Sequence, residues 1–335
     1  MRIFLGFIKW FLTLCLVVAL AGGWLFYKDA TSPLVFEKER VDFQILPGSS
    51  LKTAIRDISN AGVTLNPWTF RILGKIMRAE SAIKAGSYEI RQGTTPQELL
   101  EKLTRGDVSQ TEITFIEGWT FRQIRERLDA HPDVRHETKD LSDQEIMQRI
   151  GAPDVFPEGR FFPDTYLFVK QSADIDVLAR AFRIMREHLD REWGARQADL
   201  PYRDAVEALI MASIIEKETG READRPIIAA VFVNRLRQNM LLQTDPTVIY
   251  GMGESFDGNL RRQDLTTDTP YNTYTRAGLP PTPIAMPGLA SLRAALNPAQ
   301  SSALYFVARG DGTSEFSNTL EEHNRAVSLY QRKGR

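Results

Sequence analysis

Residues 206–219 read VEALIMASIIEKET, and this stretch organises the second half of the chain. It contains no Gly or Pro, and most of its residues are good helix formers. Helical character also dominates the chain from Asp174 to about Leu242. We therefore predict a mainly helical region in which residues 206–219 form one helix.

Two carboxylates, Glu216 and Glu218, stand near the end of this predicted helix. At about 100° per residue their side chains point about 200° apart, so they cannot share a face. Glu218 shares its face with Met211, Ile214 and Ile215, which are bulkier than the residues beside Glu216. Apolar surroundings raise the pKa of a carboxyl group, as a general acid requires near neutral pH. Its position on the helix therefore favours Glu218 over Glu216 as the catalytic group.

A structural interpretation also fits both glutamates. Either could form an ion pair with Lys217 or Arg221, and a Glu-x-Glu pair on a helix is weak evidence for catalysis by itself. Two supporting roles stay open for Glu216, which could position Lys217 and the neighbouring loops or only hold the structure.

Segments rich in Pro, Gly and polar residues follow the helix at 242–253, 269–275, 277–281 and 283–288. Five side chains in them suit an uncharged polar ligand such as a glycan, because aromatic rings stack on sugars and hydroxyl or amide groups bond to them. They are Gln243, Thr244, Tyr271, Asn272 and Tyr274. Structural turns are the alternative, since Pro and Gly clusters are typical of turns. Asp245 precedes Pro246 and either caps a turn or acts as a second carboxylate.

Residues 10–27 read WFLTLCLVVALAGGWLFY and contain no charged residue. As a helix this run would rise about 27 Å, close to the roughly 30 Å hydrocarbon core of a bilayer. Trp10, Trp24 and Tyr27 stand near its ends, where aromatic rings favour the membrane interface. We therefore predict a transmembrane helix.

The flanking charges predict the orientation of this helix. Arg2 and Lys9 precede it, whereas the charges that follow it nearly cancel. The positive-inside rule places the N-terminus in the cytoplasm and the rest of the chain outside. The alternative is a signal peptide cleaved near Ala19-Leu20-Ala21, but the apolar run continues to Tyr27 and favours a retained anchor.

A similar sequence pattern then occurs three times. Each copy contains a predicted Gly turn, a Ser or Thr residue and a predicted amphipathic helix. Ser50, Thr95 and Thr120 are the predicted helix N-caps. The first two copies together resemble a LysM-like glycan-binding module over residues 43–108, although turn–cap–helix sequences are common in α+β proteins. Residues 29–40 are predicted to be a short tether before it.

The composition of the chain excludes several classes of protein and of site. The chain has 335 residues, with 42 Lys and Arg against 43 Asp and Glu and a net charge of −1. This balance excludes a disordered acidic or basic chain and argues against nucleic acid as the main partner. The single cysteine, Cys15, excludes an internal disulfide, and the four His residues form no zinc-like cluster. We expect neither a metal ion nor another cofactor.

Several motifs in order resemble the endolytic murein transglycosylase (MltG, YceG-like) family. They are Met211–Thr219, Leu242–Gly251, Tyr271–Tyr274, Gly278–Pro281, Pro287-Gly288 and His323-Asn324. The resemblance covers nearly the whole chain and is weakest over residues 134–155. It implies an inner-membrane enzyme that cuts peptidoglycan glycan strands internally, with a LysM-like domain before the catalytic domain and the catalytic glutamate at Glu218.

The implied reaction needs a single carboxyl group. Glu218 would protonate the glycosidic oxygen between N-acetylmuramic acid and N-acetylglucosamine, then take the proton of the muramyl C6 hydroxyl as a 1,6-anhydro ring closes. Two alternatives are a peptidoglycan hydrolase that uses Glu218 and Asp245, and a non-catalytic wall-binding scaffold. The family and the anchor also imply contact with peptidoglycan synthases.

Together these patterns predict an α+β protein in four parts. Residues 1–28 hold the cytoplasmic N-terminus and transmembrane helix, 29–40 the tether, 41–110 the LysM-like module, and 111–335 a mainly helical α+β catalytic domain with long loops. The expected location is the bacterial inner membrane, crossed once, with the catalytic domain in the periplasm and peptidoglycan glycan strands as its substrate.

Overall fold

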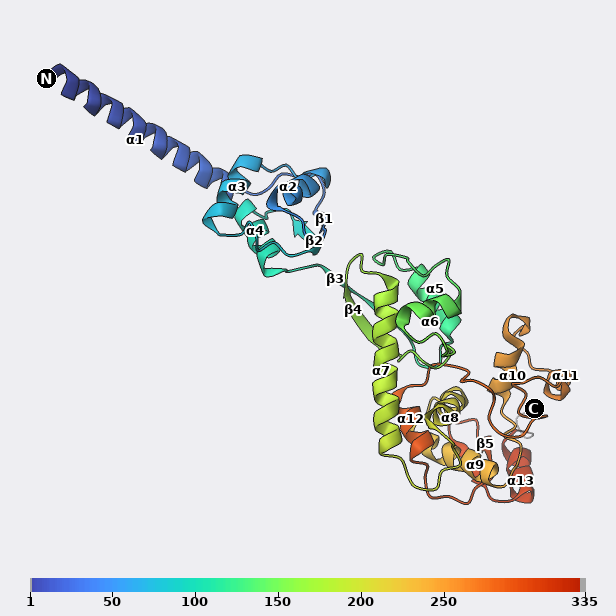
Figure 1. Ribbon diagram of the computed structural model, residues 1–335. Coiled ribbons are helices and arrows are strands. Elements are labelled where there is room, and N and C mark those ends of the chain that lie inside the picture. The colour runs from blue at the N-terminus through green and yellow to red at the C-terminus, as the bar shows by residue number, and fades with distance from the viewer. Residues whose placement is uncertain (1, 332–335) are drawn as a thin grey trace. The chain divides into compact units, whose positions relative to one another are not determined.

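The structure is a computed structural model that describes residues 2–331, with side chains from residue 7 onward. It divides into two compact units, and each is described by itself (Figure 1). Unit 1 runs to Thr111 and also includes Leu167–Ser172, while unit 2 comprises Glu112–Tyr166 and the chain from Ala173 onward. Helices and strands occur in both units, so the predicted α+β class is confirmed.

Unit 1 is a small sheet covered by helices. Its elements are α1 (Arg2–Thr31), β1 (Arg40–Ile45), α2 (Leu51–Asn60), α3 (Pro67–Ile76), β2 (Gly86–Arg91) and α4 (Pro96–Arg105). Strands β1 and β2 pair antiparallel, with Phe43 opposite Tyr88 and their rings stacked 5.8 Å apart. Alternate residues of β1 are buried, as expected of a strand with one face on a core.

The predicted helix N-caps are confirmed in both units. The hydroxyl groups of Ser50 and Thr95 accept hydrogen bonds from the backbone N–H groups of Thr53 and Glu98 at the starts of α2 and α4. Thr120 caps α5 (Phe121–Asp129) in the same way. Each cap satisfies a backbone donor that has no partner within its helix.

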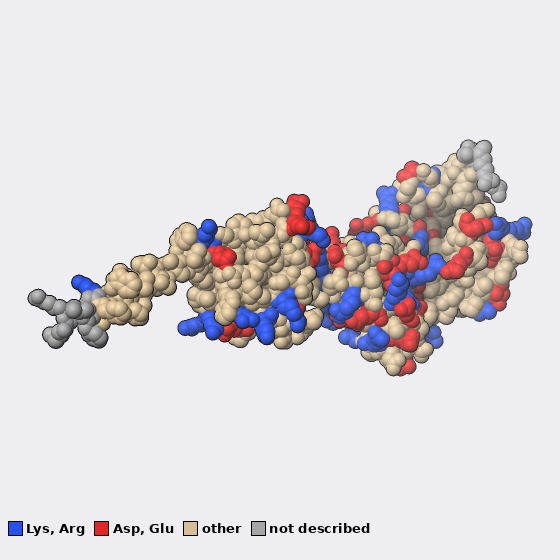
Figure 2. Space-filling view, turned by 90° about the horizontal axis from the view of Figure 1, so that it is seen from above, with Lys and Arg blue, Asp and Glu red and all other residues tan. Residues whose placement is uncertain are grey.

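The apolar N-terminal run forms the middle of α1. Among the described residues, the segment Phe7–Thr31 is the one helix long and apolar enough to cross a membrane, with a mean hydropathy of 1.9. Figure 2 shows this helix with charged side chains only near its ends. Its length and composition are compatible with a membrane anchor.

Residues 29–40 do not form the predicted tether. Helix α1 continues to Thr31, and the side chains of Ala30, Leu34 and Phe36 are buried in the core of unit 1. Burying a large apolar side chain such as Leu34 stabilises a fold by about 1.5–3 kcal/mol, which favours packing over an extended linker.

Unit 1 also takes in a short segment from much later in the chain. The Ser87 hydroxyl donates to the carbonyl oxygen of Lys170 over 2.5 Å, and the Lys170 N–H donates to the carbonyl of Ser109 over 3.0 Å. The Lys170 ammonium lies 3.2 Å from the carboxylate of Asp42. The compact unit is therefore built from two separate stretches of sequence and differs from the contiguous module expected over residues 41–110.

Unit 2 is mainly helical. After α5 it contains α6 (Asp143–Ile150), α7 (Asp174–Gly194), α8 (Ala205–Glu218), α9 (Arg225–Arg237), α10 (Asp245–Met252), α11 (Arg262–Thr266), α12 (Leu289–Leu296), β5 (Tyr305–Ala308), β6 (Ser314–Ser317) and α13 (Leu320–Tyr330), with short 3₁₀ turns at Glu222–Asp224 and Gly253–Ser255. Strands β5 and β6 pair antiparallel. Strands β3 (Gln110–Thr114) and β4 (Thr165–Val169) form a third pair, and the division between the units passes through both of them.

Helix α8 lies at the centre of unit 2 and confirms the helix predicted over residues 206–219 to within a residue. Every residue from Ala208 to Ile215 is buried, and helices α7, α9, α10 and α12 contact it. A helix that is apolar on all sides is typically buried on all sides. The two faces of α8 therefore do not differ in burial in the way that the sequence analysis had assumed. Glu216 and Glu218 differ instead in the residues that each contacts at the end of the helix.

Candidate active site

Glu218 is the last residue of α8, and its carboxyl group turns toward the start of α10. The Thr244 hydroxyl donates a hydrogen bond to Oε1 of Glu218. Burial raises the pKa of Glu218, the Thr244 hydrogen bond opposes this, and the charge of Asp245 raises the pKa further. Burial is the largest effect, and its direction is the one expected from the sequence.

Thr244 is held from two sides by buried threonines. Its backbone N–H donates to the Thr273 hydroxyl over 3.1 Å, and its carbonyl accepts from the Thr247 hydroxyl over 2.9 Å. The two hydroxyl groups of Thr247 and Thr273 also lie 2.9 Å apart. The sequence analysis missed both residues, although Thr247 stands three positions after Thr244, on the same side of the first turn of α10.

Asp245 and Tyr274 form a second polar contact beside this carboxyl group. The Tyr274 hydroxyl donates to Oδ1 of Asp245 over 2.5 Å. Burial raises the pKa of Tyr274, and the bond to Asp245 and the charges of Asp245 and Glu218 raise it further. The structure thus brings together Glu218, Thr244, Asp245 and Tyr274, and Asp245 accepts a tyrosine hydroxyl rather than a hydrogen bond that caps a turn.

Asn272, which was expected to bind a glycan, is fully buried. Its side chain instead forms hydrogen bonds within its own loop. Its amide nitrogen donates to three backbone carbonyls between Asp264 and Thr267, at 2.7–3.2 Å. Its amide oxygen accepts from the N–H of Tyr274 over 2.9 Å. These bonds account for the hydrogen-bonding capacity of the amide, so Asn272 shapes the loop that presents Tyr274.

Tyr271 and Gln243 occupy different surroundings. The Tyr271 hydroxyl lies 2.9 Å from the Thr282 hydroxyl, and its ring meets that of Tyr250 edge-on at 5.0 Å. Tyr271 is therefore part of the packing beneath the site. Gln243 is exposed, and its φ of 51° lies in the left-handed region, which non-glycine residues seldom adopt. This turn leads the chain directly into Thr244.

Arg235 is another residue that the sequence analysis missed. It is buried, and its guanidinium donates to the carbonyls of Leu241 and Leu242 over 3.2 and 2.8 Å and to that of Leu304 over 2.7 Å. The guanidinium also lies over the ring of Tyr305, 5.2 Å from its centroid. Its charge lowers the pKa of Glu218. Arg235 therefore fixes the segment that ends in Thr244 and places a positive charge near the carboxyl group.

Glu216 has a different environment from Glu218. Its carboxylate lies 3.2 Å from the guanidinium of Arg225 and accepts from the N–H of Gly288 over 2.9 Å. The two charged side chains are only 6% and 9% exposed. Lys217 instead donates to the carbonyl of Gly118 over 3.2 Å. Glu216 thus joins the end of α8 to the starts of α9 and α12, which supports the structural role left open for it.

The residues of this site lie in the part of the chain that a known family covers. Residues 43–329 match the YceG-like family. The chain belongs to this family.

An endolytic murein transglycosylase of Bacillus subtilis (strain 168) is 32% identical over 329 residues, which cover 93% of this chain and 91% of the relative. An endolytic murein transglycosylase of Streptococcus pneumoniae (strain D39) is 28% identical and matches 92% of this chain and 62% of its own length. The crystal structure of a YceG-like protein from Listeria monocytogenes is similar with 30% identity and a TM-score of 0.53, and it covers 86% of this chain and 99% of that one.

A further carboxyl group lies buried in unit 2 of this YceG-like protein. Glu158 accepts hydrogen bonds from the N–H of Phe121 over 3.0 Å and from the hydroxyl of Tyr250 over 3.1 Å. Burial raises the pKa of Glu158 from 4.5 to about 7. The sequence analysis did not identify Glu158, whose neighbours Phe161 and Tyr166 are in the core. Glu158 links the start of α5 to the later part of α10.

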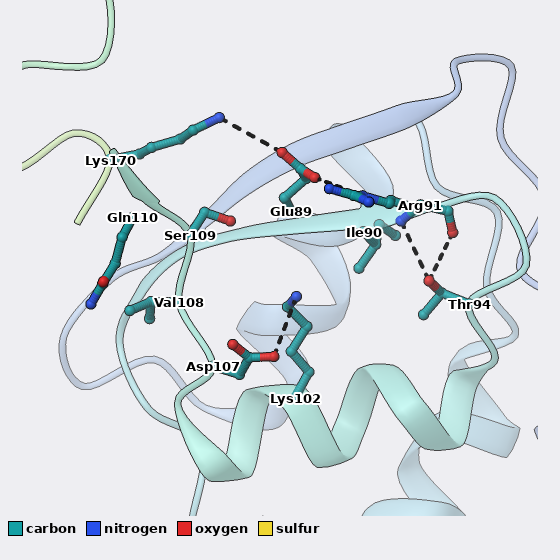
Figure 3. A pocket seen from close by; sticks show the side chains of 10 residues that line it. All are labelled: Glu89, Ile90, Arg91, Thr94, Lys102, Asp107, Val108, Ser109, Gln110 and Lys170. Atoms are coloured by element: carbon teal, nitrogen blue, oxygen red, sulfur yellow. Dashed lines mark hydrogen bonds and ion pairs between the residues drawn. The ribbon is translucent and has the colours of Figure 1, made fainter. Parts of the chain in front are cut away.

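Unit 1 of this YceG-like protein contains an open cavity of about 440 Å³ (Figure 3). Its charged side chains are paired with one another, Glu89 with Arg91 and Lys170, and Lys102 with Asp107. The other lining side chains are Ile90, Thr94, Val108, Ser109 and Gln110. Because each of these charged side chains already has a partner of opposite charge, the cavity suits a neutral polar ligand better than an ion.

Proposed function

We propose that this chain is a lytic transglycosylase that cleaves the β-1,4 bond between N-acetylmuramic acid and N-acetylglucosamine within peptidoglycan strands. The name of the bacillar and streptococcal relatives supports the reaction class. The observation that carries the residue assignment is Glu218, a carboxyl group whose pKa is raised by burial and whose orientation is held by Thr244.

Glu218 acts first as an acid and then as a base. The protonated carboxyl group gives its proton to the glycosidic oxygen as the bond to the muramyl C1 breaks. The 2-acetamido group of the same sugar stabilises the electron-poor C1, as in substrate-assisted glycosidases. The carboxylate then takes the proton of the C6 hydroxyl, whose oxygen bonds to C1. The product ends in a 1,6-anhydromuramyl residue and no water is consumed.

The neighbouring residues divide into two groups. Thr244 bonds to Oε1 of Glu218 and leaves the other oxygen to exchange the proton with the substrate. The exposed Gln243 and the partly buried Tyr274 are the expected sugar contacts, because they flank the carboxyl group and retain accessible surface. Tyr271 and Asn272 hold the loop behind them.

Hydrolysis is the second candidate because Asp245 lies close enough to Glu218 to raise its pKa. In that reaction Asp245 would activate a water molecule or attack C1, and two carboxylates would be essential. Replacement of Asp245 by Asn would then abolish cleavage, whereas the lytic reaction would be weakened but retained.

Helix α1 is proposed to anchor the enzyme once in the inner membrane, with the N-terminus in the cytoplasm and both units in the periplasm. Its apolar length and the basic residues before it support this topology. An enzyme held there would act on strands close to the membrane, within reach of peptidoglycan synthases.

Unit 1 is proposed to be a LysM-like glycan-binding module, with the cavity of Figure 3 as its binding surface. Hydroxyl and amide groups of Thr94, Ser109 and Gln110 are the type of side chain that binds sugar hydroxyls. Titration of a Glu218→Gln chain with glycan fragments, with and without Thr94→Ala and Gln110→Ala, measures this binding.

The deciding experiment incubates the full chain in detergent with purified glycan strands and identifies the new ends by mass spectrometry. We expect ends that are one water lighter than the hydrolysis product. Glu218→Gln should lower the rate by about 10²–10⁴-fold. Glu207→Gln is the matched control, because Glu207 lies at the opposite end of α8.

Heavier ends would identify a hydrolase. An unchanged cellular role for the Glu218→Gln chain would identify a scaffold, and undiminished cleavage by it would remove Glu218 from the mechanism.

A further inference from the structure

Helix α3 of unit 1 presents an apolar stripe on its outward face. Trp68, Ile72 and Ile76 are 73%, 45% and 65% exposed. They stand four residues apart and therefore share one side of the helix. The opposite side carries Phe70 and Leu73, which are buried in the core of unit 1. A stripe of large exposed apolar residues that the core does not need indicates a surface that contacts something else.

The stripe continues onto the segment that leaves α1. Val35 is 68% exposed and pairs with Thr64, just before the start of α3. Val35 follows the end of α1 by only four residues. The exposed patch, defined as Val35, Trp68, Ile72 and Ile76, therefore extends from the exit of α1 along α3.

Helix α1 is packed onto the same unit. Phe26, which belongs to the uncharged run of residues 10–27, packs against the core of unit 1, and Ala30 is buried in it. Helix α3 is one of the elements that α1 contacts (Figure 1). If residues 10–27 fill the hydrocarbon region, unit 1 has no spacer that could lift it from the bilayer. Its surface around the exit of α1 must then meet the lipid headgroups.

The charges on α3 fit such a position. Arg71 and Lys75 are exposed on the same outward face as the apolar stripe. Long basic side chains next to apolar residues are typical of helices that lie in the membrane interface, where they reach lipid phosphates. Trp68 also has the amphipathic ring that is enriched at this depth.

We propose that the outward face of α3 is a membrane-docking surface, with Trp68, Ile72 and Ile76 inserted among the headgroups and Arg71 and Lys75 on lipid phosphates. This inference rests on the proposed anchoring by α1. The occupant is the lipid bilayer itself, because the patch is continuous with the point where the predicted transmembrane helix leaves it. Docking at two places, α1 and α3, would fix the orientation of unit 1 at the membrane surface.

The test places one environment-sensitive fluorophore at a time in the full chain, reconstituted in vesicles of phosphatidylethanolamine and phosphatidylglycerol. The native Cys15 reports on insertion of α1. Ile76→Cys in a Cys15→Ser chain reports on the patch, and Asp107→Cys in the same chain is an exposed control outside it. Quenching by lipid-attached nitroxide is compared with quenching by aqueous iodide.

We expect lipid quenching and a blue-shifted emission at positions 15 and 76, and iodide quenching at position 107. Iodide quenching at 76 as strong as at 107, with position 15 in lipid, overturns the docking surface and leaves the anchor intact. Iodide quenching at 15 overturns the anchor as well. Shielding of position 76 from both quenchers overturns lipid docking in favour of a protein interface.

A second measurement uses the apolar residues themselves. In a chain labelled through Val35→Cys, the triple change Trp68→Ser, Ile72→Ser and Ile76→Ser removes the stripe without touching the core. We expect the probe at position 35 to lose lipid quenching and gain iodide quenching, while a probe at Cys15 is unchanged. Unaltered quenching at position 35 would contradict a docking role for the stripe.

Discussion

The two glutamates at the end of α8 differ in the partner that each meets. Glu216 is paired with the guanidinium of Arg225, while Glu218 accepts a hydrogen bond from the hydroxyl of Thr244 in a partly buried position. A carboxyl group whose pKa is raised by burial can exchange its proton near neutral pH. This difference in partners supports the proposal that Glu218, rather than Glu216, is the acid–base group.

Removal of the Thr244 hydroxyl should change the pH dependence of cleavage. In Thr244→Val the carboxylate of Glu218 loses a donor, so its pKa rises further and the decline of kcat/KM at alkaline pH moves to higher pH. The rate near neutral pH should fall by about ten- to hundredfold, because the carboxyl group also loses its orientation.

The pH profile of anhydro-end formation measures both effects of the change at Thr244. Thr244→Ser keeps the hydroxyl and should restore most of the rate and the original profile. An unshifted alkaline limb in Thr244→Val would show that the hydroxyl does not act through Glu218.

Substitution of the two glutamates should have opposite effects on stability. Glu216→Gln leaves the buried Arg225 charge with only the more exposed Glu117 carboxylate, 4.0 Å away, and should lower the free energy of unfolding by about 3 kcal/mol. Glu218→Gln removes a carboxylate whose charged form is disfavoured by burial, so stability at pH 8 should be equal or higher. Urea unfolding of the two variants compares them, and equal destabilisation would contradict the assigned roles.

At the scale of elements, α10 is held near both of its ends. Its first residues adjoin Thr244, which bonds to Glu218, and Tyr250 near its other end bonds to Glu158. Glu158 in turn accepts from the first N–H of α5. We infer that Glu158 is a positioning residue, since it fixes the helix whose start shapes the site.

The raised pKa of Glu158 predicts a pH-dependent stability. Its ordinary value of 4.5 applies to the unfolded chain and the value of about 7 to the fold. The stability contributed by the protonated group is fully present below pH 4.5 and is lost as the pH rises through 7. This loss corresponds to about 3 kcal/mol.

Glu158→Gln should remove this dependence. At pH 4 the variant and the parent chain should be about equally stable, and at pH 8 the variant should be more stable by up to about 3 kcal/mol. Thermal unfolding between pH 4 and 8 measures the difference in stability between the variant and the parent chain. The other titrating groups are the same in both chains, so their contributions cancel in this difference. A constant difference across this range would contradict the raised pKa.

Local patterns predicted the elements well. The caps at Ser50, Thr95 and Thr120 and the helix over residues 206–219 depend on neighbouring residues and were visible in the sequence. The roles within the site depend on tertiary partners and were not visible. Nothing adjacent to Asn272 shows that three carbonyls surround its amide, and Arg235 contacts residues 69 positions away.

At the scale of the whole molecule, contacts between distant parts of the chain were likewise not predictable from the sequence. A charged and apolar stretch between an apolar helix and a folded unit has the composition of a linker, yet Ala30, Leu34 and Phe36 belong to the core of unit 1. The pairing of residues 167–172 with that unit likewise joins parts of the chain that are far apart in sequence.

Shortening the chain should therefore affect unit 1. A chain beginning at Val41 loses Leu34 and Phe36 from the core, and unit 1 should lose about 3–6 kcal/mol of stability relative to a chain beginning at Asp29. Limited proteolysis, followed by identification of the cut sites, measures this for unit 1 in particular.

Point substitutions separate this effect on unit 1 from chain length. In the chain beginning at Asp29, Leu34→Ala should cost about 2–5 kcal/mol, whereas the change Glu37→Ala at an exposed neighbour should cost almost nothing. Equal protease resistance of the two variants would contradict a packing role for residues 29–40 and would indicate that they are a linker.

Lys170 and its neighbours complete unit 1, although they lie within the sequence of unit 2. Neither unit can therefore be transferred to another protein as one contiguous stretch of sequence. Genetic recombination exchanges contiguous stretches, and a crossover near residue 110 would give the recipient a module without its last segment. The two halves should therefore be inherited together, and engineers who wish to transplant unit 1 must carry residues 167–172 with it.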